Sequence, residues 1–206
     1  MISEKTIIRL DKSHIALAGE VLGRSLKDDP SSVHVIPNKE ERHSKIHHVF
    51  QMTSCLGVRF GEVHATSLNL EGISVWLPFK VYKVKFFNAL ICSLKAKMYK
   101  LGMEASRRVK PIQDADKEAH LEFAPTEHWY LQTLGVDPPY QGKGYGTILV
   151  KYMLDKIDKN PLPVFLETSN PRNVRFYEKL GFKVMKEYPV PGTGVTQWYM
   201  LREKNE

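Results

Sequence analysis

Apolar residues recur along the chain with two periods, one typical of helices and one typical of strands. A spacing of three and four predicts helices over residues 15–26, 46–56, 84–101 and 142–157. The second of these helices presents one largely apolar face and ends at Gly61. The residues of that face are Ile46, Val49, Phe50, Thr53 and Leu56.

Shorter apolar runs predict strands, and turn residues separate them. The strands are expected over residues 6–10, 62–70, 72–78, 129–136, 164–168, 182–188 and 197–201. A short helix over residues 171–180 ends at Gly181, while the polar segment 105–126 has no clear period. The order predicts a mixed α/β sheet in which the helix-linked strands of the second half run parallel.

Length and composition predict an ordinary globular protein. The chain has 206 residues with no repeat, linker or low-complexity tract, so we expect one domain over residues 1–206. No signal-like segment or bilayer-length apolar run is seen, which favours a cytoplasmic protein. Cys55 and Cys92 lack motif spacing and are expected to be free thiols.

The chain is basic, with a formal net charge of +7 and a pI of about 9.3. This charge favours anionic partners, which include nucleic acid, membrane surfaces and phosphorylated cofactors. The aromatic residues follow core periodicity instead of alternating with arginines on one face, so nucleic-acid binding is not expected. The lysine-rich face of residues 81–100 is more typical of solvent exposure than of lipid contact.

A glycine-rich loop is the sharpest motif. Gly142, Gly144 and Gly146 lie between a strand that ends near Val136 and a predicted helix. Glycines let backbone N–H groups turn towards a ligand, and a helix N-terminus carries partial positive charge. No acidic residue occurs from position 138 to 154, and Lys143 adds a positive charge. The loop therefore predicts a phosphate-binding site, although a glycine cluster alone can also be a simple turn.

Two other nucleotide motifs do not match this loop. The dinucleotide fingerprint needs a glycine where Thr147 stands, and only about 60 residues follow, too few for the rest of a doubly wound sheet. The P-loop needs G-K-[ST] after four spacer residues, and that sequence is missing. The loop is therefore more consistent with binding the pyrophosphate of coenzyme A than with either of these nucleotide motifs.

Two segments identify a family by resemblance. Residues 136–146 resemble the V-x-P-x-x-[QR]-G-x-G-x-[GA] signature of GNAT acetyltransferases, and residues 170–182 resemble the N-x(6)-Y-x(3)-G-F segment of that superfamily. Residues 165–173 and the strand Val75-Trp76-Leu77-Pro78 are similar to the puromycin N-acetyltransferase-like subgroup. The resemblance implies a GNAT fold, with a mixed, mostly antiparallel twisted sheet of about six to seven strands and helices on both faces.

The resemblance also implies where acetyl-CoA, the co-substrate, binds. The backbone groups of Leu134 and Val136 would bond the pantetheine arm, and Gly135 is expected to cause the irregularity that opens the sheet. Asn170 and Asn173 would contact the coenzyme, although a helix cap and a buried amide are alternative roles. The pyrophosphate loop would comprise Gln141, Gly142, Lys143, Gly144, Tyr145, Gly146 and Thr147.

Acyl transfer to an amine needs a base for the amine, a donor for the oxyanion and an acid for the thiolate. Tyr177 occupies the general-acid position of the family, although a core aromatic is the alternative role. Glu167 interrupts an apolar strand and is the candidate base, or else a carboxylate paired inside the protein. His128 and Tyr130 are weaker candidates, and His128 is expected to be exposed at a strand end.

The acceptor pocket is less defined by the sequence. Trp76, Asp28, Asp29, Tyr82 and Trp198 are candidate lining residues, and an acidic pair would suit a cationic amine. The resemblance implies acetyl transfer to the amine of a small molecule by direct attack in a ternary complex, without a metal and as a monomer or homodimer. The alternative is a catalytically silent acyl-CoA-binding module of the same fold.

Overall fold

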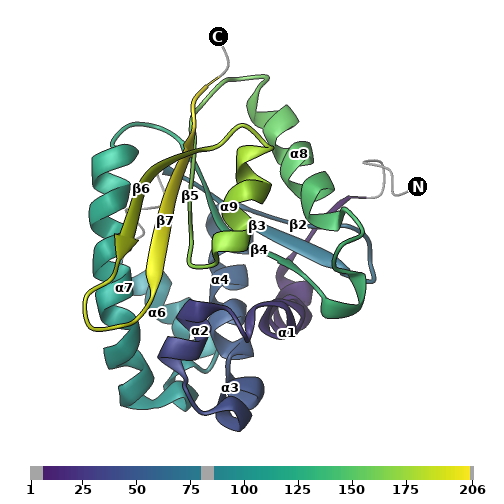
Figure 1. Cartoon of the computed structure of the whole chain (residues 1–206). Coiled ribbons are helices and arrows are strands. Elements are labelled where there is room, and N and C mark those ends of the chain that lie inside the picture. Colours follow the sequence, from purple (N-terminus) through teal and green to yellow (C-terminus); the bar gives the residue numbers. More distant parts are fainter. Residues whose placement is uncertain (1–6, 80–85, 205–206) are drawn as a thin grey trace.

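The computed structural model describes residues 7–79 and 86–204, and its strands join in one seven-stranded sheet (Figure 1). The strand order is β1-β2-β3-β4-β5-β7-β6. β4 and β5 pair in parallel, as the sequence predicts for helix-linked neighbours, and the other described pairings are antiparallel. The strands are β1 (Ile8–Arg9), β2 (Glu62–Ala65), β3 (Gly72–Pro78), β4 (Trp129–Val136), β5 (Val164–Thr168), β6 (Lys183–Pro189) and β7 (Thr196–Arg202).

Helices cover both faces of this sheet (Figure 1). α1 and α4 pack on β2, β3 and β4, and α7 extends that layer over β5 and β7. α8 and α9 lie on the opposite face. The helices are α1 (Ile15–Leu26), α2 (Pro30–Val35), α3 (Lys39–Lys45), α4 (His47–Phe60), α6 (Phe86–Lys95), α7 (Gly102–Phe123), α8 (Tyr145–Ile157) and α9 (Pro171–Glu178). Short 3₁₀ turns are η2 (Lys12–His14), η3 (Met98–Leu101) and η4 (Pro138–Tyr140).

One helical prediction is corrected, and one segment without a prediction is helical. The single helix expected over residues 84–101 is α6 followed by η3, because Lys97 has a positive φ of 55° that interrupts the helix. The polar segment without a predicted structure is most of α7, a helix of 22 residues. Its inward face is narrow, and Ala105, Ile112 and Ala119 are the buried apolar residues on it. The first predicted strand, over residues 6–10, begins at residue 6, which lies outside the described residues.

β4 is irregular on both of its edges. It pairs with β5 at Trp129 and Tyr130 and then diverges, so the strands separate beyond this point. On its other edge the register shifts between Val75 and Trp76, and Gln132 is left without a partner. The sequence placed this irregularity at Gly135, which is wrong. Gly135 instead permits close packing of α1, since a Cβ there would lie 2.7 Å from Leu22 Cδ2.

The two cysteines form a disulfide, which corrects the prediction of free thiols. Cys55 in α4 and Cys92 in α6 are bonded, with Cα atoms 5.7 Å apart, although 37 positions separate them in the chain. The bond joins the two helices on the same face of the sheet. None of the helices in the described ranges is both long enough and apolar enough to cross a membrane.

Candidate active site

A cavity of about 420 Å³ lies between the α2, α4 and α7 layer and the sheet. Its sheet wall is formed by β4 and β5 where they separate, together with Gln197 of β7. The apolar face predicted for the second helix forms part of the opposite wall, and all five of its residues line the cavity. The predicted site residues that line it are Asp29, Tyr130, Leu134, Glu167, Asn173 and Tyr177.

Two carboxylates line the cavity and interact electrostatically with each other. Glu167 of β5 accepts a hydrogen bond from the Tyr130 hydroxyl. Asp116 of α7 accepts from Gln197 Nε2 at 3.0 Å and from the Tyr199 hydroxyl at 3.2 Å. Burial raises the pKa of Asp116 to about 7. Burial and the negative charge of Asp116 raise the pKa of Glu167 well above its ordinary value. The pair is therefore suited to exchange protons near neutral pH.

Tyr177 reaches the same cavity from α9, on the other face of the sheet. Its side chain is buried, and its ring packs edge-on against Phe176 and Phe182. Burial, followed by the carboxylates of Glu167 and Asp29, raises the pKa of Tyr177. The hydroxyl therefore keeps its proton at neutral pH and is available as a donor.

Asp29 contributes a third carboxylate to the cavity wall. It caps α2 by accepting from the Ser31 backbone N–H at 3.1 Å, and it also accepts from the Ser169 hydroxyl. Burial raises the pKa of Asp29 above its ordinary value. The α2 segment thus carries a candidate substrate contact, and its placement determines the shape of this end of the cavity.

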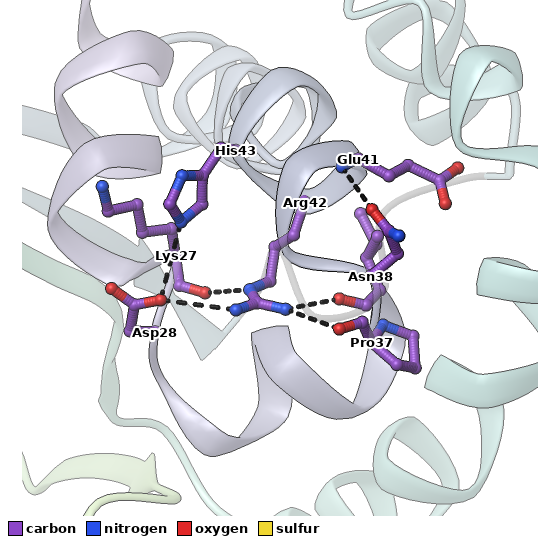
Figure 2. A network of polar contacts seen from close by, with 8 residues as sticks. Lys27, Asp28, Pro37, Asn38, Glu41, Arg42 and His43 are labelled. Carbon is purple, nitrogen blue, oxygen red and sulfur yellow. Dashed lines mark hydrogen bonds and ion pairs between the residues drawn. The ribbon is translucent and has the colours of Figure 1, made fainter.

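A buried arginine holds the α2 segment at both ends (Figure 2). Arg42 donates to the backbone oxygen of Lys27 at 2.6 Å, before α2, and to those of Ile36 at 2.9 Å and Pro37 at 3.1 Å, after it. Asp28 lies 3.4 Å from the same guanidinium. The planar fork satisfies three carbonyl groups that the chain turns leave without helical partners.

We expect Arg42→Met to lower the free energy of unfolding by about 2–4 kcal/mol, because three carbonyl groups lose a buried donor. The free energy of unfolding of Arg42→Lys should lie between those of the wild type and Arg42→Met, since one ammonium group cannot reach all three carbonyl oxygens. Urea unfolding measures the change. The matched control is Arg107→Met, whose side chain is 76% exposed. Equal losses for Arg42→Met and Arg107→Met would contradict the proposed clamp.

The glycine loop has the geometry expected of an anion-binding turn. Gly142 and Gly144 have φ angles of 75° and 85°, and α8 begins directly after them without a side-chain cap. Within the described chain, the backbone N–H groups of Gly142, Lys143 and Gly144 donate to no other protein group. The first turn of α8 contains no acidic residue. These amides are therefore available to an anionic ligand.

The flanks of the loop are fixed to neighbouring elements. Gln141 donates to the backbone oxygen of Val136 at 3.0 Å, and Lys143 donates to that of Pro139 at 3.0 Å. Arg24 of α1 holds Asp137 through two bonds of 3.0 and 2.8 Å. The start of α8 lies on β4, since a Cβ at Gly146 would be in ordinary van der Waals contact, at 3.7 Å, with the Leu134 and Val136 side chains. Tyr145 and Thr147 are half-buried in the first turn of α8.

The predicted polar stripe of α9 lies on one side of the helix. Asn170 caps α9 by accepting from the Arg172 backbone N–H at 3.1 Å, so the capping role is observed. Asn173 donates to the Thr168 hydroxyl at 3.0 Å and lines the cavity. Arg172, Arg175, Glu178 and Lys179 are exposed, as predicted for the opposite side.

Several sequence candidates lie away from the cavity. Asp28 points to Arg42 and His43 and is 65% exposed. Trp76 is buried in the core beneath α8, and Trp198 alternates with Gln197 and therefore faces away. Tyr82 lies outside the described residues. His128 is buried beside His120, with 2.6 Å between their Nε2 atoms, which corrects its expected exposure.

Sequence reasoning missed several polar residues of the cavity, among them Asp116, Gln132 and Gln197. Asp116 lies in the segment without a predicted structure, so no face was assigned to it. Gln197 was placed on a strand, and it is two positions before the apolar-flanked Tyr199, so both side chains lie on the same, buried face of that strand.

Comparison with known proteins agrees with this geometry. The model of the acetyltransferase (GNAT) family matches residues 108–182, which include Asp116, the glycine loop, Glu167 and Tyr177. An uncharacterised N-acetyltransferase of Schizosaccharomyces pombe is 27% identical over 180 residues, covering 84% of this chain and 72% of the relative.

Solved structures share the fold. A histone acetyltransferase HPA2 and related acetyltransferase from Corynebacterium glutamicum has a TM-score of 0.66 at 17% identity, covering 98% of this chain and 97% of that one. Arylalkylamine N-acetyltransferase 2 from Aedes aegypti has a TM-score of 0.61 at 12% identity, covering 97% and 98%. Residues 108–182 therefore match the GNAT acetyltransferase family, and the whole chain is similar in sequence to a relative named as an N-acetyltransferase and in fold to solved acetyltransferase structures, which supports an acyltransferase.

Proposed function

We propose that this chain forms one domain that transfers an acetyl group from acetyl-CoA to the amine of a small molecule, by direct attack in a ternary complex. The observation that carries the proposal is that two features adjoin β4, which separates from β5 beyond Tyr130. One is the loop with free amides at 142–144, and the other is the cavity that contains Glu167, Asp116 and Tyr177. We keep the cytoplasmic location and the monomer or homodimer state as predictions, which cell fractionation and ultracentrifugation test.

The residues of the site fit acetyl-CoA as a substrate. The amides of Gly142, Lys143 and Gly144 would bind the pyrophosphate, with Lys143 adding charge. The backbone of Leu134 and Val136 would bond the pantetheine arm, since β5 does not pair with β4 there. Asn173 lines the same cavity as Leu134 and Tyr177.

The chemistry assigns one proton step to each polar group. Glu167, assisted by Asp116, would accept a proton from the substrate ammonium, so that the nitrogen lone pair attacks the thioester carbon. The Leu134 backbone N–H would donate to the carbonyl oxygen as charge develops. Tyr177 would donate its proton to the sulfur as the C–S bond breaks, and the second proton lost by nitrogen would restore the phenol.

Substitution of one loop glycine tests the binding half of the proposal. An L-residue at Gly144 is strained by about 1–2 kcal/mol, because φ is positive. The loop is expected to relax from this shape, and binding must restore it, so Gly144→Ala should weaken acetyl-CoA binding about tenfold in calorimetry.

The matched control is Gly192→Ala in the β6–β7 turn. Gly192 has a φ of 74°, and a Cβ added there, like one added at Gly144, would meet no atom within 4 Å. Both variants should lose similar stability, while acetyl-CoA affinity changes at Gly144 alone. Equal affinity in the two variants would remove the loop from the site. Wild-type binding without thiol release across an amine panel would instead favour a silent acyl-CoA-binding module.

A further inference from the structure

We propose that the acetyl acceptor is an amphipathic amine, with its ammonium group held by Asp116, Glu167 and Gln197 and its apolar body seated against α4, η3 and α7. The proposal rests on the acetyl transfer proposed above and names the substrate class of that site. Three observations support it: the cavity is lined by carboxylates, two glutamine side-chain oxygens in it lack hydrogen-bond partners among the described residues, and one part of its wall is apolar.

The charge of the cavity wall is one-sided. Asp29, Asp116 and Glu167 line it, and none of the described lining residues is a lysine, arginine or histidine. The donors to Asp116 are the neutral groups of Gln197 and Tyr199, and the Tyr130 hydroxyl donates to Glu167. A buried negative charge is costly without a positive partner, so the cavity is complementary to a cation.

Unpaired acceptors support the same ligand independently of the carboxylates. Gln197 is 3% exposed, and its Oε1 atom has no hydrogen-bond partner among the described residues. Its Nε2 atom is already used by Asp116, so the free carbonyl oxygen needs a donor from outside the chain. Gln132, the unpaired residue of β4, also lines the cavity with an unpartnered Oε1. An ammonium group has three N–H donors and no acceptor, which is what these oxygens lack.

The wall of the cavity that α4, η3 and α7 form is mostly apolar. Phe50 of α4, Leu101 of η3 and Val109 of α7 line it, together with Val35 and Ile46. The volume of about 420 Å³ falls in the range of pockets that hold drug-sized ligands. A short hydrophilic amine would leave this apolar wall in contact with water, whereas an amine with an apolar tail would bury it. A diamine would place its second charge beside these apolar side chains, where it would lose its hydration.

A series of amines on the wild-type protein tests the proposal, with thiol release from acetyl-CoA as the readout. Ethylamine, hexylamine and 1,6-diaminohexane share one reacting group and differ in the tail. We expect kcat/KM to rise at least tenfold from ethylamine to hexylamine, because each buried methylene adds affinity. We expect it to fall at least tenfold from hexylamine to the diamine.

Two variants assign the polar and apolar parts of the cavity wall. Gln197→Leu should raise KM for hexylamine about tenfold and leave the acetyl-CoA Kd unchanged, because it removes one acceptor for the ammonium. Val109→Phe should reduce the space at the apolar wall and reverse the preference for hexylamine over ethylamine. Val109 is half-buried, and circular dichroism checks that the variant folds.

The outcomes separate this inference from the acetyl-transfer proposal. Acetyl-CoA binding with equal kcat/KM for ethylamine, hexylamine and the diamine overturns the amphipathic acceptor and leaves acetyl transfer in place. Faster turnover of hexanoyl-CoA with ethylamine than of acetyl-CoA with hexylamine also overturns it, because the apolar wall would then hold the acyl chain. Lack of acetyl-CoA binding overturns both.

Discussion

Tyr177→Phe is expected to lower kcat for acetyl transfer by about 10²–10⁴-fold, the usual contribution of a general acid, with little change in acetyl-CoA affinity. The ring fills the same space, so its contacts with Phe176 and Phe182 are kept. The loss is that of the proton donor to the leaving sulfur. Steady-state kinetics of thiol release give kcat, and calorimetry gives the Kd of acetyl-CoA.

The control for this variant is Tyr99→Phe, which removes the same hydroxyl from a side chain that is 70% exposed on η3. It should leave kcat and Kd unchanged. An unaltered kcat in Tyr177→Phe would exclude the acid role, while a large loss of acetyl-CoA affinity would indicate a binding role instead.

Glu167→Gln is expected to reduce kcat/KM by about 10²–10⁴-fold, because the amine loses its proton acceptor.

Glu167→Gln should also have a higher free energy of unfolding than the wild type above neutral pH, by on the order of 1 kcal/mol. The pKa of Glu167 is raised in the folded state, so the native protein binds this proton more tightly than the unfolded chain. Its stability therefore falls as pH rises from the ordinary carboxylate range through the folded pKa. Urea unfolding at pH 5 and pH 8 measures the difference.

The pH dependence of kcat/KM in a variant of Asp116 tests whether Glu167 is the base. The charge of Asp116 raises the pKa of Glu167, so Asp116→Asn should move the acidic limb of kcat/KM to lower pH. Asp114→Asn is the matched control, since Asp114 is exposed two positions away on α7 and pairs with Lys110. An acidic limb that stays in place in Asp116→Asn but disappears in Glu167→Gln would show that the two groups titrate independently.

The elements that form the sheet wall of the site were predictable from local sequence. β3, β4 and β5 begin and end at the predicted residues, because each is a mostly apolar run bounded by turn residues. The glycine loop was also predictable, since positions that need a positive φ favour glycine, and glycines stand at positions 142 and 144 of the sequence. The face of α4 that lines the cavity follows from helical spacing alone.

The rest of the site depends on contacts between distant segments. Asp116 is one carboxylate on a mostly polar helix, and its role follows from its position near Glu167, 51 positions later in the chain (167 minus 116). The pairing of Cys55 with Cys92 depends on how α4 and α6 pack. Trp76 resembled a pocket residue, yet strand alternation places it in the core beneath α8. Such features become visible only when the register and packing are known.

The central claim is that the loop at 141–146 binds a diphosphate and thereby directs a thioester to the Tyr177 hydroxyl. A crystal structure of the protein with coenzyme A and an unreactive amine measures this geometry directly. We expect the pyrophosphate on the amides of Gly142, Lys143 and Gly144, and the sulfur within hydrogen-bonding distance of the Tyr177 oxygen. A coenzyme bound elsewhere, or a sulfur beyond the reach of that hydroxyl, would contradict the account.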